Sequence, residues 1–323
     1  MSTPLTINSV ETLEQALPII RKAQELYSTF SQEQVDAICE KSAMAVSKMR
    51  IPLAKMACEE TGYGIMVDKV TKNQYASEHV WNYMRNKKTC GVIEENKAFG
   101  TMRIASPKGV IAAITPTTNP TSTTIYKMLL ALKTRNAIIL SPHPHAVNCS
   151  IAAAKIIRDA AIEAGLPEHV ISWVSVPSLE ISDYLMKNVD LIMATGGSGM
   201  VKAAYSSGTP AIGVGPGNCN VVIDESADLR MAVESIIHSK TFDNGMICAS
   251  EQHITVLASV YDEVKRLLKE ARCYFLKDDE AAKVAEVFFN SKTHGVKPGA
   301  VGQTANRLAE MAGIDVPYDT KVL

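Results

Sequence analysis

The sequence lacks the features that mark several classes of protein. Its 33 basic and 34 acidic residues leave a formal net charge of −1, which provides no electrostatic basis for binding nucleic acid or an anionic membrane surface. Its longest apolar runs, such as residues 109–114, are too short to span a bilayer. The first residues contain no charged segment followed by an apolar one, which is the pattern of a secretion signal. We therefore expect a cytoplasmic protein that binds neither nucleic acid nor membranes.

Cysteine is too sparse and too scattered to build a disulfide framework. The chain has seven cysteines, an odd number, and no pair of them has the CxxC spacing of a metal or redox site. His143 and His145 have no neighbouring carboxylates that would complete a metal site. We therefore expect free thiols in a reducing compartment and no bound metal.

The middle of the chain alternates between short apolar segments and amphipathic ones. This pattern is typical of parallel strands connected by helices that cover both faces of the sheet. The predicted fold class is therefore α/β, and 323 residues are enough for two domains. Amphipathic segments before residue 90 predict a helical N-terminal part, in which Ser31 caps one helix and residues 68–87 form another. The predicted strands are residues 109–114, 136–140, 170–174, 191–194 and 221–223, and the predicted helices between them are residues 121–133, 146–164, 178–187 and 199–206.

Loops after three of the predicted strands carry residues suited to binding, because parallel sheets bind ligands beyond the carboxyl ends of their strands. Residues 115–120 combine prolines, threonines and an asparagine, and residues 141–145 contain two histidines. Residues 195–199 place glycines where a helix begins, so that a pyrophosphate could reach backbone N–H groups. Taken alone, ordinary capped turns explain these residues as well, and the glycine spacing is not the GxGxxG fingerprint.

Cys248 stands just after a glycine-bearing turn. It follows an amphipathic segment, residues 229–240, and precedes a β-rich segment, residues 253–257. A thiol on a short connection can be directed at a substrate instead of being buried in a core. Spacing alone leaves a second interpretation equally open, in which Cys248 is a small, buried, inert residue.

These segments together resemble the aldehyde dehydrogenase superfamily. Residues 244–252, Asn-Gly-Met-Ile-Cys-Ala-Ser-Glu-Gln, resemble its active-site segment, and most closely that of the branch that transfers acyl groups to coenzyme A. The resemblance implies an aldehyde-dehydrogenase-like fold, with N-terminal helices and a parallel, doubly wound cofactor domain in residues 1–228. It implies the start of an incomplete α/β catalytic domain in residues 229–323. The other segments that carry the resemblance are residues 109–120, 136–145, 194–199 and 203–220.

The resemblance also implies an activity. An aldehyde, coenzyme A and NAD or NADP would be converted reversibly to an acyl-CoA and the reduced cofactor, through a thioester on Cys248. Asn119 would supply an amide to the oxyanion hole, although the usual position of this asparagine in the superfamily corresponds to Thr118. The small-molecule partners would be a small aldehyde or an acyl-CoA, with coenzyme A as co-substrate.

A set of residues at the strand ends is implied to bind the nicotinamide cofactor. Hydrolytic members of the superfamily carry a water-activating glutamate where Gly213 falls, so the resemblance does not favour water as the acyl acceptor. By its glycine content alone, the segment 211–218 is predicted to be a turn between strands. The implied cofactor-binding residues are Thr115, Pro116, Thr117, Ser141, Pro142, His143, Thr195, Gly196, Gly197 and Gly213.

Two other functions are kept as alternatives. One is a hydrolytic aldehyde dehydrogenase, and the other is a truncated, non-catalytic interaction module. Residues 318–323 resemble the entrance to a further strand, so we expect a longer parent protein, which the resemblance implies to be a homo-oligomer. The cytoplasm is the expected location, either free or within a bacterial microcompartment.

Overall fold

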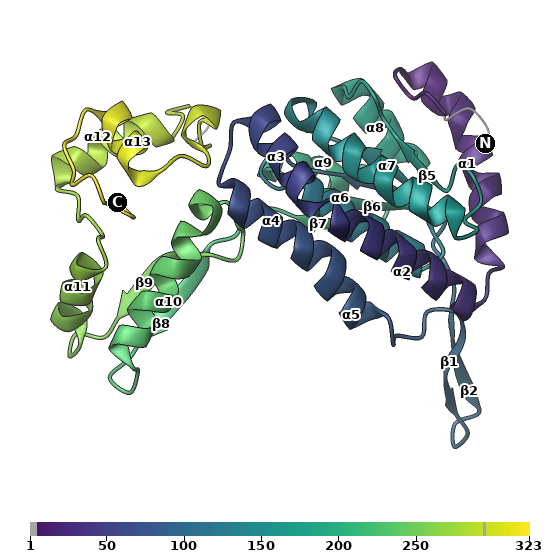
Figure 1. The fold of residues 1–323 in the computed structure, drawn as a ribbon, viewed down its shortest axis with the longest axis horizontal. Coiled ribbons are helices and arrows are strands. Elements are labelled where there is room, and N and C mark those ends of the chain that lie inside the picture. Colours follow the sequence, from purple (N-terminus) through teal and green to yellow (C-terminus); the bar gives the residue numbers. More distant parts are fainter. Residues whose placement is uncertain (1–4, 293–294) are drawn as a thin grey trace. The chain divides into compact units, whose positions relative to one another are not determined.

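The computed structural model describes residues 5–292 and 295–323, which form two compact units. One unit contains residues 5–62 and 69–215, and the other contains residues 63–68 and 216–323. The first is built on a larger sheet and the second on a smaller one (Figure 1). The predicted division of the chain into two domains, residues 1–228 and 229–323, stays a prediction.

The first unit is organised around a five-stranded parallel sheet. Its strand order is β5-β4-β3-β6-β7, and every residue of β3 and β4 is buried, as their uninterrupted apolar sequences predict. The α/β class and the parallel sheet are therefore confirmed. The strands are β3 (Val110–Ile114), β4 (Ala137–Ser141), β5 (Ile171–Trp173), β6 (Leu191–Thr195) and β7 (Ala211–Val214).

Helices connect these strands and cover both faces of the sheet. The chain leaves β3 toward β4 and β5, then returns to the other side of β3 at β6 and continues to β7. Because such crossovers are right-handed, the helices of the two halves lie on opposite faces. The sheet is therefore doubly wound, as predicted. The connecting helices are α6 (Pro120–Lys133), α7 (Val147–Glu163), α8 (Leu179–Asn188) and α9 (Ser198–Ser206).

The N-terminal helices pack on this framework. Ser31 caps α2 through a hydroxyl that accepts a hydrogen bond from the Gln34 N–H, as predicted. The helix predicted over residues 68–87 is instead three consecutive segments, because a π-helical turn interrupts the regular α-helical hydrogen bonds. The segments are α1 (Val10–Ser28), α2 (Gln32–Lys48), α3 (Arg50–Thr61), α4 (Met66–Gln74), η1 (Tyr75–His79) and α5 (Val80–Met84).

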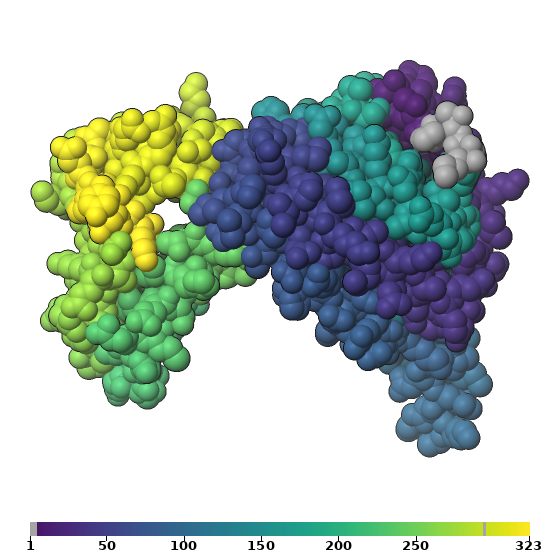
Figure 2. Space-filling model, in the orientation of Figure 1, coloured from purple at the N-terminus to yellow at the C-terminus, as the bar shows by residue number. Residues whose placement is uncertain are grey.

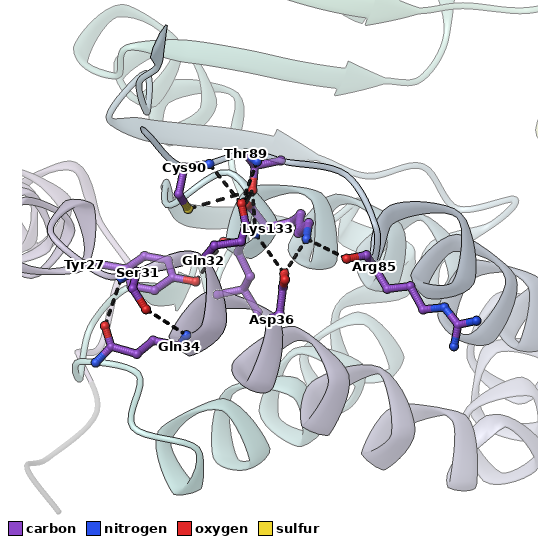
Figure 3. A network of polar contacts seen from close by, with 10 residues as sticks. Tyr27, Ser31, Gln32, Gln34, Asp36, Arg85, Thr89, Cys90 and Lys133 are labelled. Carbon is purple, nitrogen blue, oxygen red and sulfur yellow. Dashed lines mark hydrogen bonds and ion pairs between the residues drawn. The ribbon is translucent and has the colours of Figure 1, made fainter. Parts of the chain in front are cut away.

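A polar network fixes the chain where it leaves α5 (Figure 3). The Gln32 side-chain oxygen accepts hydrogen bonds from the Thr89 N–H at 2.8 Å and from the Cys90 N–H at 3.1 Å. Lys133, only 1% exposed, forms an ion pair with Asp36 and thus buries its charge with a partner. The network joins α2, α6 and the segment that leads into the next strand.

A β-hairpin follows this anchor. Strand β1 (Gly91–Asn96) pairs antiparallel with β2 (Thr101–Ala105), and the hairpin extends away from the rest of its unit (Figures 1 and 2). This hairpin was not predicted from the sequence. Nearly all its residues are exposed, so its sequence lacks the alternation of apolar and polar residues that a half-buried strand shows.

The second unit has its own parallel pair of strands, β8 (Cys219–Ile223) and β9 (Glu251–Val256), connected by α10 (Leu229–Thr241) and η3 (Phe242–Gly245). The expectation that residues 221–223 join the large sheet is therefore wrong. An apolar run predicts a buried strand but does not specify its neighbour, and here Ile223 packs in a separate cluster with residues of α10 and α11. The remaining helices are α11 (Tyr261–Glu270), α12 (Asp278–Phe288), η4 (Pro298–Ala300) and α13 (Ala305–Ala312).

Across the part of the chain that the structure describes, no helix combines the length and the apolar character that a membrane span requires.

Candidate active site

The carboxyl ends of the parallel strands form one row. Ile114 of β3 lies opposite Ser141 of β4 and Ala194 of β6, and Ala194 lies opposite Gly213 of β7. The three loops singled out from the sequence therefore leave the same edge of the sheet. Strand β3 has its successor β4 on one side and β6 on the other, so this edge contains the topological switch point where such sheets bind ligands.

The β3–α6 loop carries an unsatisfied polar group. Thr115 is 2% exposed, and its hydroxyl oxygen is buried without a hydrogen-bond partner. Pro116 and Thr117, which follow it, are half-buried. In the next loop Ser141 and Pro142 are buried, whereas His143 is exposed. A buried hydroxyl without a partner at the switch point fits a site where a bound cofactor completes the hydrogen bonding.

The β6–α9 loop leaves a helix N-terminus uncovered. Gly197 is the N-cap of α9, and no side chain caps the first turn. A Cβ atom added at Gly197 or Gly199 would meet nothing within 4 Å, so the space beside these N–H groups is open. Thr195 and Gly196 precede them at the strand end. These residues fit the phosphates of a dinucleotide, which helix N-termini bind through N–H groups and the helix dipole.

Gly213 lies in a strand rather than in a turn. The expectation of a turn over residues 211–218 is wrong for its first half, because residues 211–214 form the edge strand β7. A Cβ at Gly213 would lie 2.8 Å from both Tyr205 and Val201 of α9, and the Tyr205 hydroxyl accepts the Gly213 N–H at 3.0 Å. A larger residue at this position requires these two side chains to move.

Lys127 connects the two strands at the switch point. This lysine of α6 is 3% exposed, and its ammonium group donates to the carbonyls of Ile114 at 2.6 Å and Met193 at 2.7 Å. Burial lowers the pKa of Lys127 to about 7. No role was predicted for this residue, because one lysine within an amphipathic helix has no distinguishing local signal.

Asn119 is held by a lysine of α4. The Lys72 ammonium donates to the Asn119 side-chain oxygen at 2.7 Å, and the Lys69 ammonium donates to the Thr118 carbonyl at 3.0 Å. Neither lysine was predicted from the sequence, in which they precede their partners by 47 and 49 residues. The signal that could have identified them is their i, i+3 spacing, which places both on one face of a helix.

Cys248 belongs to the other unit, on the segment between η3 and β9. The turn before it has three consecutive residues in the left-handed region, with φ of 50° at Asp243, 53° at Asn244 and 72° at Gly245. Aspartate, asparagine and glycine are the residues that adopt this conformation at least cost. The sequence Asp-Asn-Gly therefore specifies the sharp turn that precedes the thiol.

Hydrogen bonds hold this turn within its unit. The buried Asp243 carboxylate accepts the Ile65 N–H at 2.7 Å, and the Asp243 N–H donates to the Asp68 carboxylate at 2.7 Å. The Asn244 amide donates to the Gly302 carbonyl at 2.8 Å. These contacts stabilise backbone angles that would otherwise be unfavourable.

The backbone of Cys248 is in close contact with the entrance to β8. The Cys219 thiol lies 3.4 Å from the Cys248 carbonyl oxygen and donates to it. A Cβ at Gly217 would lie only 2.1 Å from the same oxygen. Glycine is therefore required at residue 217 so that the two segments can pack at this distance.

The close contact at Gly217 yields a prediction. We expect Gly217→Ala to displace the Cys248 backbone, to lower any activity that uses this thiol, and to destabilise the protein by about 2 kcal/mol. Gly215→Ala is the matched control, because its Cβ would approach nothing nearer than 3.8 Å. Chemical denaturation and thiol-labelling rates measure the two effects. Equal behaviour of the two variants would show that the contact is not required.

Cys248 also differs from the other thiols in exposure. All seven cysteines lie in the described residues and none is in a disulfide, and Cys248 alone is exposed, while the others are buried or half-buried. The interpretation of Cys248 as a buried residue is therefore wrong. Within residues 5–292 and 295–323, no three His, Cys, Asp or Glu side chains are grouped so as to hold a metal ion.

Comparisons with known proteins support this arrangement. Residues 5–284 match the model of the aldehyde dehydrogenase family. The chain is 52% identical over 319 residues to an aldehyde-alcohol dehydrogenase of Clostridium acetobutylicum, and the match covers 99% of this chain and 37% of that protein. The chain thus spans well under half of that relative.

Solved structures give the same assignment. An acetylating aldehyde dehydrogenase from Geobacillus thermoglucosidasius has a TM-score of 0.92 and 44% identity, over 97% of this chain and 69% of that chain. Rhodopseudomonas palustris propionaldehyde dehydrogenase, solved with bound CoA and an acylated cysteine, has a TM-score of 0.84 and 30% identity, over 99% of this chain and 72% of that chain. The resemblance seen in the sequence is confirmed, and the chain belongs to the aldehyde dehydrogenase family.

Proposed function

We propose that the protein oxidises a small aldehyde and transfers the resulting acyl group to coenzyme A, with NAD or NADP as hydride acceptor. The observation that carries the proposal is Cys248, the one exposed thiol, on a turn whose backbone is fixed by its neighbours. A solved family member has an acylated cysteine and bound CoA, which supports the same use of a thiol here.

Cys248 is the nucleophile in this proposal. Its sulfur, as the thiolate, attacks the aldehyde carbon, and the Asn119 amide donates a hydrogen bond to the oxygen that becomes negatively charged. NAD or NADP, when bound, supplies the hydride acceptor. Loss of hydride from the substrate carbon leaves an acyl thioester on Cys248. A thioester retains enough free energy for transfer to a second thiol, so the overall reaction runs in both directions.

The cofactor is proposed to lie at the carboxyl edge of the large sheet. The N-terminal N–H groups of α9 would bind its phosphates, because Gly197 and Gly199 leave that helix end open and Gly196 precedes it. The Thr115 hydroxyl, which is buried without a partner, would donate to or accept from the bound group. The other proposed contacts are Pro116, Thr117, Ser141, Pro142, His143, Thr195 and Gly213.

Gly213 supports coenzyme A rather than water as the acyl acceptor. A water-activating carboxylate is absent from this position, and the Cβ of any such residue would clash with Tyr205 and Val201 of α9. The thioester is therefore protected from hydrolysis until a thiol arrives. This argues against the hydrolytic alternative.

One assay tests the proposal and separates it from both alternatives. NADH or NADPH formation is measured over a panel of short aldehydes, with and without coenzyme A, and the product is identified as acyl-CoA or free acid. We expect reduction of the cofactor that depends on coenzyme A and yields acyl-CoA. Free acid formed at the same rate without coenzyme A would identify a hydrolytic enzyme. A protein that reduces no cofactor under either condition would favour a non-catalytic module.

We also propose a homo-oligomer in the cytoplasm. The support is membership of the aldehyde dehydrogenase family. Light scattering on the purified protein and fractionation of cells measure these two properties. A monomeric mass or recovery with the membrane fraction would contradict them.

A further inference from the structure

Three side chains of α4 hold the loop that carries Asn119. Lys69 and Lys72 donate to the Thr118 carbonyl and to the Asn119 side-chain oxygen. Asn73, which is 1% exposed, accepts a hydrogen bond from the Thr121 hydroxyl at 2.8 Å. Spacings of three and four residues put all three on one face of the helix. A single helix face thus fixes the backbone before Asn119, its side chain and the start of α6.

The hydrogen bond from Lys72 determines which group of the Asn119 amide, the oxygen or the NH₂, remains available to another partner. An ammonium group can only donate hydrogen bonds, so the amide oxygen must face Lys72 and the amide NH₂ group must face away from it. The NH₂ group has one long hydrogen bond, 3.3 Å to the Thr118 hydroxyl, and two hydrogens to donate. A positive charge 2.7 Å from the amide oxygen also polarises the amide and strengthens its N–H groups as donors.

We propose that Lys72 is a positioning residue, which orients and polarises the Asn119 amide so that its N–H group stabilises the oxyanion formed when the thiol attacks the aldehyde. This inference rests on the proposed function, because it assumes that an oxyanion forms. Lys72 acts through Asn119 and touches neither the substrate nor the sulfur in this role. Its effect must therefore disappear when Asn119 is removed.

A double-mutant cycle tests the role. We expect Lys72→Met to lower kcat about tenfold with little change in the KM for the aldehyde, because a misplaced donor affects the transition state most. Asn119→Ala should lower kcat about a hundredfold. In the Asn119→Ala background, Lys72→Met should add less than about a twofold loss. Lys72→Arg, which keeps a cationic donor, should recover most of the rate.

Controls separate this role from a structural one and from the proposed function. Lys55→Met, at an exposed lysine of α3, should leave kcat unchanged, and thermal unfolding reports whether each variant is folded. If the losses of kcat from the two single changes multiply in the double variant, Lys72 does not act through Asn119 and its proposed role is overturned. Mass measurement of an acyl group on Cys248 of the wild-type protein reports on the chemistry itself. If the wild-type protein forms no thioester, the proposed function and the role of Lys72 are overturned together. If the thioester forms but the losses of kcat multiply, only the role of Lys72 is overturned.

Discussion

Cys248→Ala should abolish coenzyme-A-dependent reduction of the cofactor, with a loss of about 10⁴-fold or more, and should leave cofactor binding intact. The loss is large because every later step needs the thioester, and no other described thiol is exposed to replace the missing sulfur. The residues proposed to bind the cofactor lie in the other unit, so a change of one sulfur at Cys248 should not alter them. Steady-state rates and equilibrium binding of the reduced cofactor, followed by its fluorescence, measure the two effects.

Cys273→Ala provides the matched control. Cys273 lies in the same unit, half-buried against the apolar cluster of α10 and α11, and burial raises its pKa to about 11. It is therefore a protonated thiol at neutral pH and a poor nucleophile, and its replacement should leave the rate within about twofold of wild type. Alkylation at neutral pH should label Cys248 before Cys273. Full activity of Cys248→Ala, or earlier labelling of Cys273, would contradict the assignment.

Much of the fold could be predicted because it depends on residues that are close together in the sequence. The uninterrupted apolar runs of β3 and β4 predict strands buried on both faces, and the structure has them so. The loops after these strands could be selected as candidate binding regions because the carboxyl ends of parallel strands share one edge. Cys248 was singled out by the resemblance of residues 244–252 to a family segment, because spacing alone left a buried cysteine equally open, and the structure shows it exposed after the Asp-Asn-Gly turn.

The features that escaped prediction depend on contacts distant in sequence. Residues 211–218 are rich in glycine, which favours a turn, but pairing with β6 makes residues 211–214 an edge strand. Residues 221–223 predict a strand correctly, but nothing local specifies that the partner is β9 instead of the large sheet. Lys72 and Asn119 meet across 47 residues, and only the packing of α4 on the β3–α6 loop brings them together.

Lys127→Met should remove a pH-dependent contribution of several kcal/mol from the free energy of unfolding. The folded protein holds the pKa of Lys127 at about 7, whereas lysine in an unfolded chain titrates near about 10.4. Between these pH values the unfolded chain binds a proton that the folded protein does not bind. The free energy of unfolding of the wild type therefore gains up to about 1.4 kcal/mol for each pH unit from 7 toward 10, and below pH 7 the folded state carries the full cost of a buried charge.

Methionine at residue 127 has no proton to bind, so the variant lacks this dependence. The stability of Lys127→Met relative to wild type should therefore fall by about 3 kcal/mol between pH 7 and pH 9.5. Loss of the two hydrogen bonds to the Ile114 and Met193 carbonyls adds a constant cost at every pH and does not affect the slope. Urea denaturation of both proteins across this range gives the difference directly, and Lys202→Met, at an exposed lysine of α9, controls for the loss of one positive charge. A difference between Lys127→Met and wild type that stays constant with pH would mean that the ammonium group is charged in the folded protein throughout, with its two carbonyl partners sufficient to stabilise it.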